Sequence, residues 1–160
     1  QEIVVVCHSL SQAYPLAVVR AASLCASPAL LEGLRALTPP WAVSLPGQVA
    51  AVKALEDPVY YQQQYRATAT AREQMRHDLQ QLGLEVIPGV ANFLLAFLPH
   101  QGPTAAEVTK RCRQWGVHLR DASSMGSQLG PHALRTAVKS PQHNQRIVAA
   151  IEKALQLVGA

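Results

Sequence analysis

The apolar residues of the chain recur with two different periods, and each period predicts a different kind of element. Near the start they form unbroken runs, Ile3 to Val6 and then Leu16 to Cys25, the second interrupted by Arg20. Such runs are typical of strands buried on both faces, as in a parallel sheet. Between 58 and 82 the spacing alternates between four and three residues, which predicts a long helix with one inward-facing stripe. The stripe consists of Tyr61, Tyr65, Thr68, Arg72, Met75, Leu79 and Leu82.

Start and stop signals mark the ends of the other helices. Ser27-Pro28 and Asp57-Pro58 each place a capping residue before a proline at the first helical position. Thr104 and Glu107 form a capping box, and Gly116 ends the helix that this box begins. We therefore expect helices over 28–37, 45–56, 58–82, 104–115 and 141–158.

Short apolar runs between these helices predict four further strands, over 84–87, 93–98, 117–120 and 133–138. The run 93–98 has no polar alternation, so we expect it to be a central strand. From residue 45 onward the order is helix-helix-strand-strand-helix-strand-strand-helix. This order predicts an α+β fold with helices on one face of a small, mainly antiparallel sheet. Residues 1–44 contribute two strands and one helix, which is too little to close a core.

Composition and charge exclude several classes of function. The 160 residues are 49% hydrophobic, enough for the core of about one domain. The net charge is +4, but the Lys and Arg residues are scattered and aromatic residues make up only 5%, so we expect no nucleic-acid partner. No uncharged apolar run approaches the ~18 residues of a membrane span. Without a signal peptide or such a span, we expect a cytoplasmic protein and no membrane partner.

Cysteine and histidine spacing argues against metal binding. Cys7, Cys25 and Cys112 lie far apart and form no C-x-x-C pair, which favours three small buried side chains over a disulfide framework or a zinc site. The six histidines are also scattered, with none at H-x-x-x-H spacing. We therefore expect no metal site.

The polar turn between the first two apolar runs is the first candidate for chemistry. Ser9 and Ser11 lie in this turn, and Arg20 interrupts the run that follows. A buried guanidinium needs an anionic partner, and two hydroxyls with a guanidinium are suited to a phosphate dianion. From the residues alone, a turn followed by a salt-bridged arginine is the alternative.

The segment from Ser9 to Arg20 reads S-L-S-Q-A-Y-P-L-A-V-V-R. It resembles the cofactor-lysine segment of fold-type-I pyridoxal-phosphate enzymes, specifically the group of histidinol-phosphate aminotransferase and threonine-phosphate decarboxylase. That group typically has S-L-S-K-A-Y/F-G-L-A-G-L-R. Ser9, Ser11 and Arg20 match the pattern, while Gln12 stands at the lysine position and two glycines are replaced.

Later segments follow the order of the same family. They are Pro39-Pro40-Trp41, Ala91 to Leu95, Leu119-Arg120-Asp121 with Ser123-Ser124, Leu134-Arg135, and Ser140-Pro141 with Asn144. The resemblance therefore covers the whole chain and implies the C-terminal half of such an enzyme. It implies that residues 1–44 are a fragment of the large pyridoxal-phosphate-binding domain, and that residues 45–160 are the C-terminal small domain.

The resemblance also implies roles for individual residues. Ser9, Ser11 and Arg20 are expected to hold the phosphate of pyridoxal 5'-phosphate. Gln12 takes the catalytic lysine position, but its amide is not nucleophilic and cannot form the imine on which this chemistry depends. The expected substrate-binding residues are Asn92, Arg120 and Arg135. From the residues alone there are structural alternatives. Asn92 is also a candidate cap of the strand that follows it, and each arginine is a candidate partner for a surface carboxylate.

The implied activity is amino-group transfer in amino-acid biosynthesis, between an amino or phosphorylated amine substrate and 2-oxoglutarate. We expect this chain to be inactive alone, because Gln12 replaces the lysine and the family's N-terminal half is not among these residues. The chain starts inside a strand without methionine, so we expect a fragment that forms a homodimer or complements that half. A threonine-phosphate decarboxylase-like enzyme is one alternative. A non-catalytic descendant that binds a ligand or a protein is the other.

Overall fold

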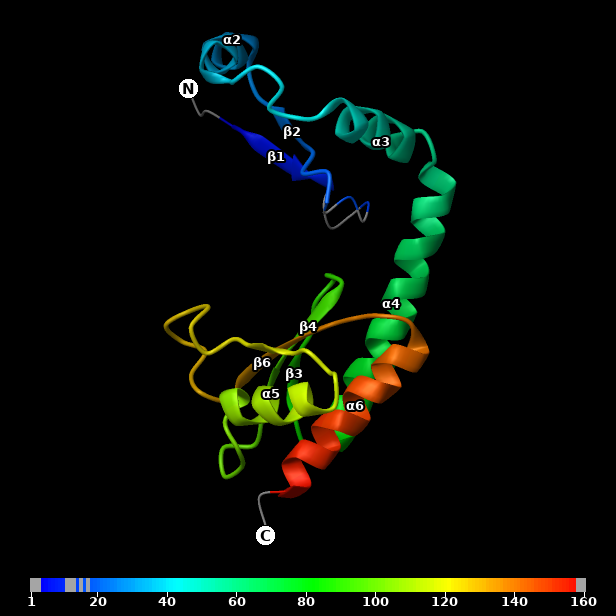
Figure 1. The fold of residues 1–160 in the computed structure, drawn as a ribbon, viewed down its shortest axis with the longest axis vertical. Coiled ribbons are helices and arrows are strands. Elements are labelled where there is room, and N and C mark those ends of the chain that lie inside the picture. Colours follow the sequence, from blue (N-terminus) through cyan, green and yellow to red (C-terminus); the bar gives the residue numbers. More distant parts are fainter. Residues whose placement is uncertain (1–3, 11–13, 15, 17, 158–160) are drawn as a thin grey trace. The chain divides into compact units, whose positions relative to one another are not determined.

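The computed structural model describes residues 4–10, 14, 16 and 18–157. The chain divides into two compact units, residues 1–63 and residues 64–160. The boundary lies inside α4 (Pro58–Gln81), the longest helix (Figure 1). In the described part of the chain, no helix combines the length and apolar character needed to cross a membrane.

The first unit contains a two-stranded antiparallel sheet followed by helices. Its elements are β1 (Val6–Ser9), β2 (Ala22–Cys25), α2 (Pro28–Leu37), α3 (Leu45–Leu55) and the start of α4. In the hairpin Val6 lies opposite Cys25, and Ser9 lies opposite Ala22. The predicted helices over 28–37 and 45–56 are confirmed to within one residue.

Local side-chain hydrogen bonds explain where α3 and α4 begin. The Ser44 Oγ accepts a hydrogen bond of 3.2 Å from the backbone N–H of Gly47. Likewise, Asp57 Oδ1 accepts one of 3.1 Å from the N–H of Tyr60. Each bond satisfies an amide that has no partner within its own helix. Asp57 therefore acts as the capping residue that the sequence predicts, whereas Ser27, the other residue predicted to cap a helix before a proline, makes no side-chain capping hydrogen bond.

The two strands of the first unit differ from their prediction in bounds and in burial. β1 begins at Val6, whereas the predicted strand over 3–6 ends there. Residues 18–20 form a turn in which Arg20 has a φ of 54°, so β2 is shorter than the predicted run 16–25. All residues of both strands are exposed and the pairing is antiparallel, so the expectation of strands buried on both faces of a parallel sheet is wrong. An apolar run shows that side chains avoid water, but it does not identify the segment that covers them.

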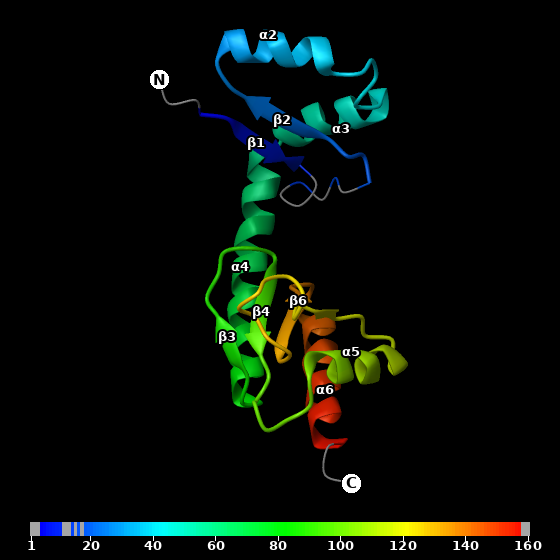
Figure 2. The same ribbon diagram turned by 90° about the vertical axis from the view of Figure 1, so that its left-hand side faces the viewer.

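The second unit is built on a four-stranded antiparallel sheet with the order β3-β4-β6-β5. Its strands are β3 (Glu85–Ile87), β4 (Phe93–Phe97), β5 (Arg120–Asp121) and β6 (Ala133–Ala137). Its other helices are α5 (Ala105–Gln114) and α6 (Pro141–Gln156). Figure 2 shows β4 between β3 and β6, which confirms the predicted central strand and the α+β class.

β5 is shorter than predicted. The expected strand over 117–120 forms a ladder only at its end, where Arg120 and Asp121 pair with β6. β5 lies at the edge of the sheet, so its length depends on one neighbour alone. Val117 is nevertheless buried, which accounts for the apolar run that suggested a longer strand.

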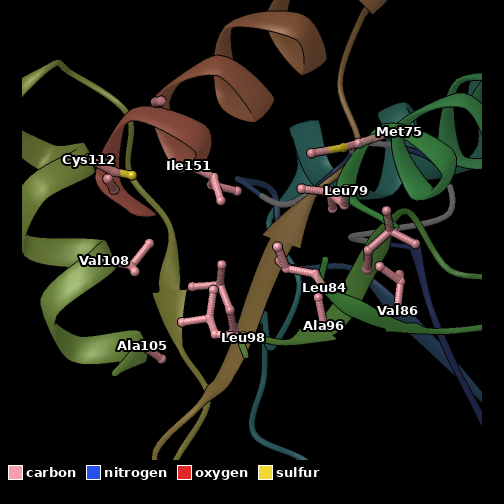
Figure 3. Close-up of a cluster of buried hydrophobic side chains, with 14 of the residues drawn as sticks. Met75, Leu79, Leu84, Val86, Ala96, Leu98, Ala105, Val108, Cys112 and Ile151 are labelled. Carbon is pink, nitrogen blue, oxygen red and sulfur yellow. The ribbon is translucent and has the colours of Figure 1, made fainter. Parts of the chain in front are cut away.

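The core of the second unit lies between one face of the sheet and the helices (Figure 3). The largest fully buried side chains on the helices are Met75 and Leu79 of α4, Val108 and Cys112 of α5, and Ile151 of α6. They share one cluster with Leu94 and Leu134 of the sheet. Burying each large aliphatic side chain stabilises the fold by roughly 1.5–3 kcal/mol. Burial alternates along β4, because only one face of the strand meets the helices.

The cysteines do not behave alike. Cys112 is fully buried, and this burial raises the pKa of its thiol to about 11. Cys7 and Cys25 are exposed free cysteines, so the expectation of three buried side chains is wrong for two of them. The reason is the exposure of β1 and β2, which the residue types alone do not reveal.

Candidate anion-binding site

The strand register places two arginines directly opposite each other. Arg120 of β5 pairs with Arg135 of β6, and Arg135 pairs on its other side with Leu95 of β4. Cross-strand partners project from the same face of a sheet. The helices cover the other face, so both guanidinium groups belong to the face that lacks a helical layer.

Arg135 is held against the sheet by an aromatic ring. Its Cζ lies 4.0 Å from the centroid of the Phe93 ring, a cation–π contact that stabilises a cation by about 0.5–2 kcal/mol. Its Nε is buried and has no hydrogen-bond partner among the described residues. This donor and the adjacent terminal nitrogens are thus fixed in place with hydrogen-bonding capacity to spare.

No described carboxylate neutralises this pair. Within 4.0 Å of either Arg120 or Arg135 the described residues place no acidic oxygen. The neighbouring Asp121 instead accepts a hydrogen bond of 2.9 Å from the backbone N–H of Ser123. Like charges directly opposite each other destabilise a sheet, and an anion bound between them removes that cost. The pair therefore has the electrostatics of an anion site.

Asn92 lies beside this pair in the chain. It precedes Phe93, whose ring contacts Arg135, and its side chain is exposed. Its carbonyl accepts a hydrogen bond of 2.9 Å from the N–H of Val138, which extends the ladder between β4 and β6. Arg72 of α4 donates to the carbonyls of Val90 and Ala91 at 3.1 and 3.3 Å and so fixes the segment before it. The backbone of Asn92 has a structural role, and a substrate contact by its side chain stays a prediction.

The residues expected at the cofactor phosphate are only partly described. Ser11 and Gln12 lie outside the described residues. Ser9 ends β1, and the N–H of Leu10 donates to the carbonyl of Ala21 at 3.2 Å, so the pairing brings Ser9 and Arg20 to the same end of the hairpin. Both side chains are exposed.

This donor set fits one part of pyridoxal 5'-phosphate and not the other. A hydroxyl and a guanidinium at one end of a hairpin suit a phosphate group. Covalent attachment requires a primary amine, and residue 12 is a glutamine. The chain therefore fits a phosphate anion at this place but not a covalently held cofactor.

The second unit also contains a pocket that the sequence does not predict. His118 and His143 line it together with Lys139 and Arg146, although they are far apart in the chain. The scattered histidines gave no signal, because two separate segments meet there only in the folded chain. Within the described ranges, no group of three His, Cys, Asp or Glu residues is arranged to hold a metal ion.

Comparison with known proteins shows the family. The family model for aminotransferase class I and II matches residues 1–151. A histidinol-phosphate aminotransferase of Rhodopseudomonas palustris (strain BisA53) is 31% identical over 150 residues, which cover 93% of this chain and 40% of that protein.

Two solved structures illustrate the shared fold. Histidinol-phosphate aminotransferase from Sinorhizobium meliloti, in complex with pyridoxal-5'-phosphate, has a TM-score of 0.88 at 19% identity and covers 97% of this chain and 42% of that chain. L-threonine-O-3-phosphate decarboxylase from Porphyromonas gingivalis has a TM-score of 0.75 at 27% identity. The match covers 95% of this chain and 46% of that chain. Both structures share the fold of this chain, and the curated relatives that match in sequence at about 30% identity are histidinol-phosphate aminotransferases.

The matches cover almost all of this chain but a minority of each relative. The chain spans about 40% of the length of the curated relatives it matches. The predicted resemblance to this family of aminotransferases is confirmed, while the roles of Ser9, Arg20, Arg120 and Arg135 stay predictions. The chain belongs to the class I and II aminotransferases.

Proposed function

We propose that this chain is the C-terminal part of a protein similar to histidinol-phosphate aminotransferase, in which Arg120 and Arg135 bind the anionic group of an amino or phosphorylated amine substrate. We also propose that the chain does not catalyse amino transfer by itself. In this proposal residues 1–44 belong to the large cofactor-binding domain and residues 45–160 to the small domain. The compact units divide later, inside α4, so α3 belongs to the first of them.

The observation that carries the proposal is the facing arginine pair. Arg120 and Arg135 are cross-strand partners in the ladder, the Arg135 guanidinium lies over Phe93, and no described carboxylate pairs with either residue. A carboxylate or phosphate group accepts hydrogen bonds from two such forks at once. The pair thus supplies binding and orientation, which are the contributions that the protein makes to a cofactor-dependent reaction.

Gln12 supports the second part of the proposal. When bound and covalently attached, pyridoxal 5'-phosphate supplies an electron sink for reactions of amines. An amide at position 12 gives the chain no group for that attachment. The remaining contribution of Ser9 and Arg20 is to hold an anion at the end of the hairpin.

Calorimetric titration with histidinol phosphate tests the arginine pair. We expect Arg135→Gln and Arg120→Gln each to weaken binding by about tenfold or more, because a hydrogen bond to a charged group is worth roughly 1.5–3 kcal/mol. Arg66→Gln is the matched control, since Arg66 is exposed on α4 and carries the same charge. Unchanged binding by both site variants, or equal weakening by the control, would contradict the proposal.

Position 12 gives a separate test. After treatment with pyridoxal 5'-phosphate and borohydride, peptide mass analysis should find no adduct on residue 12 of the wild-type chain and an adduct in Gln12→Lys. We expect Gln12→Lys still to show no amino transfer, because proton transfer and tuning of the cofactor ring require further residues that the resemblance assigns to the N-terminal half. Measurable turnover by the Gln12→Lys chain alone would refute this expectation.

A further inference from the structure

A pocket of about 490 Å³ lies in the second unit, where the end of α5 meets the start of α6. It contains neither the facing arginines nor Asn92. Pockets of this size commonly bind small molecules. Gly116 lines it together with five polar residues, which are His118, Lys139, Ser140, His143 and Arg146.

The polar lining of the pocket is basic. Lys139 and Arg146 bring two cations, His118 and His143 bring two imidazoles, and none of the lining residues is acidic. Several basic side chains around one hollow repel one another and create a positive potential that attracts anions. The lining therefore favours a negatively charged ligand.

Arg146 is anchored at the wall of the pocket. Its Nη2 donates a hydrogen bond of 3.1 Å to the carbonyl of Trp115, the residue that caps the C-terminus of α5. A guanidinium has several further N–H donors, so this bond fixes the group without exhausting it. Gly116 leaves room for the contact, because a Cβ there would lie 3.2 Å from Arg146 Nη2.

Ser140 also keeps its hydroxyl away from the usual capping position. Its Oγ lies 2.8 Å from Nδ1 of His143 and makes no side-chain cap hydrogen bond to α6. Asn144 instead fixes the start of the helix, since its Oδ1 accepts a hydrogen bond of 2.8 Å from the N–H of Lys139. The backbone at the pocket rim is thus positioned by a buried side chain, while Lys139 and the Ser140–His143 pair are exposed at the surface.

We propose that this pocket binds a phosphate group, through the charges of Lys139 and Arg146 and the hydroxyl of Ser140. A tetrahedral dianion accepts hydrogen bonds from all three kinds of donor. The volume exceeds what a bare phosphate ion fills, which favours a phosphorylated small molecule over free phosphate. The site is separate from the arginine pair, so it does not depend on the function proposed above.

NMR titration of the full chain at constant ionic strength tests the pocket. The probes are inorganic phosphate and glycerol 2-phosphate, a phosphate monoester. We expect saturable shifts of the backbone amides of Gly116 and Ser140, with Lys139→Gln weakening binding by about tenfold, as for loss of a charge-assisted hydrogen bond. Lys110→Gln is the control, because Lys110 is an exposed lysine on α5 outside the lining.

Other outcomes distinguish a phosphorylated small molecule from free phosphate as the ligand, and the pocket from the arginine pair as the binding site. Tighter binding of the monoester supports a phosphorylated small molecule, and equal binding supports a site for free phosphate. Shifts at Gly116 and Ser140 that persist in Arg135→Gln support a site independent of the arginine pair. Three results overturn the proposal: shifts that do not saturate, shifts confined to residues near Arg120 and Arg135, or binding that Lys110→Gln weakens as much as Lys139→Gln does.

Discussion

Thr136 carries a buried hydroxyl that the fold does not use. The residue lies on β6, is 2% exposed, and faces Leu94 across the sheet. Its Oγ1 has no hydrogen-bond partner among the described residues. Leaving a buried hydroxyl unpaired costs about 1–3 kcal/mol of stability. The neighbouring Arg135 presents the same situation with a charged donor, on the face where an anion can reach it.

We predict that Thr136→Val stabilises the second unit. Valine replaces the unpaired hydroxyl with a methyl group of similar shape and suits a strand, so the free energy of unfolding in urea should rise by about 1 kcal/mol. Thr109→Val is the control, because the Oγ1 of Thr109 donates 2.9 Å to the carbonyl of Ala106 and its loss should give no gain. A Thr136→Val chain no more stable than wild type would mean that the hydroxyl has a partner in solution.

At the scale of elements, the start of α5 is fixed by two reciprocal hydrogen bonds. The N–H of Thr104 donates to Glu107 Oε2 at 2.8 Å, and the N–H of Glu107 donates to Thr104 Oγ1 at 3.3 Å. These bonds complete the predicted capping box. The hydrogen bonds from the Thr104 backbone and then from its hydroxyl lower the pKa of the Glu107 carboxyl below its ordinary value.

We predict that Thr104→Ala lowers the free energy of unfolding by about 1 kcal/mol, because an amide of the first turn loses its partner. Glu107 contributes its stabilisation above the ordinary carboxyl pKa, and this contribution is lost as the pH falls through the lowered pKa of the folded state. Glu107→Gln should therefore flatten the acid limb of stability against pH, as urea titrations at several pH values would reveal.

Ser140→Ala, in phosphate-free buffer, is the control for the capping box. Ser140 precedes α6 but makes no side-chain cap hydrogen bond, so its replacement should cost less than that of Thr104. Equal losses for the two variants would show that the side-chain bond of Thr104 is not the source of the stability.

The sequence predicts the helices better than the strands, for a physical reason. The starts of α3, α4 and α5 depend on a serine, aspartate or threonine within a few residues of the bond it makes. The bounds of a strand depend on the neighbour it pairs with. β1 therefore lies several residues after its predicted position, and β5 contains only the two residues that pair with β6. The order of elements after residue 45 was fully predictable, because it needs only the type of each segment.

The same distinction applies to the candidate site. Arg120 and Arg135 stand out in the sequence as cations beside apolar runs. That they face each other follows from the register of β5 and β6, which no local signal fixes. The pocket around Lys139 and Arg146 was not predictable, because residues after the end of α5 and residues at the start of α6 line it together only in the folded chain.

At the scale of the whole molecule, exposed apolar side chains are unevenly distributed. Most of the large exposed hydrophobic residues lie between residues 4 and 65, and many are strongly exposed, such as Val18 and Trp41, each at 92%. The exceptions in the rest of the described chain are Ile87, Val90, Met125 and Leu157. Soluble proteins rarely leave large contiguous apolar patches uncovered, so this part of the chain is suited to contact with another polypeptide.

We predict that the isolated chain self-associates through residues 1–44. β1 and β2 form a two-stranded sheet with exposed apolar residues, and such strands pair with other chains. Light scattering at micromolar concentration should give a mass above the 17.3 kDa of the single chain, and deletion of residues 1–44 should reduce association. Val6→Lys should reduce it too, because a lysine on an edge strand opposes pairing.

Val90→Lys is the matched control for the association. Val90 is 94% exposed in the second unit, so a lysine there adds the same charge outside the hairpin. A single-chain mass for the wild type, or an equal effect of the two lysine variants, would count against association through the first unit.

The facing arginines also bear on how this sequence changes over generations. Since like charges across a ladder lower stability, loss of Arg120 is neutral or favourable as far as folding is concerned, and loss of Arg135 relieves the same repulsion while giving up its contact with Phe93. In a lineage whose protein binds no anion, mutation should therefore remove Arg120 or Arg135 long before it disturbs a core residue such as Ile151. Descendants that have replaced the lysine of the family yet keep both arginines are then under selection for binding, and those that keep neither are maintained by their fold alone.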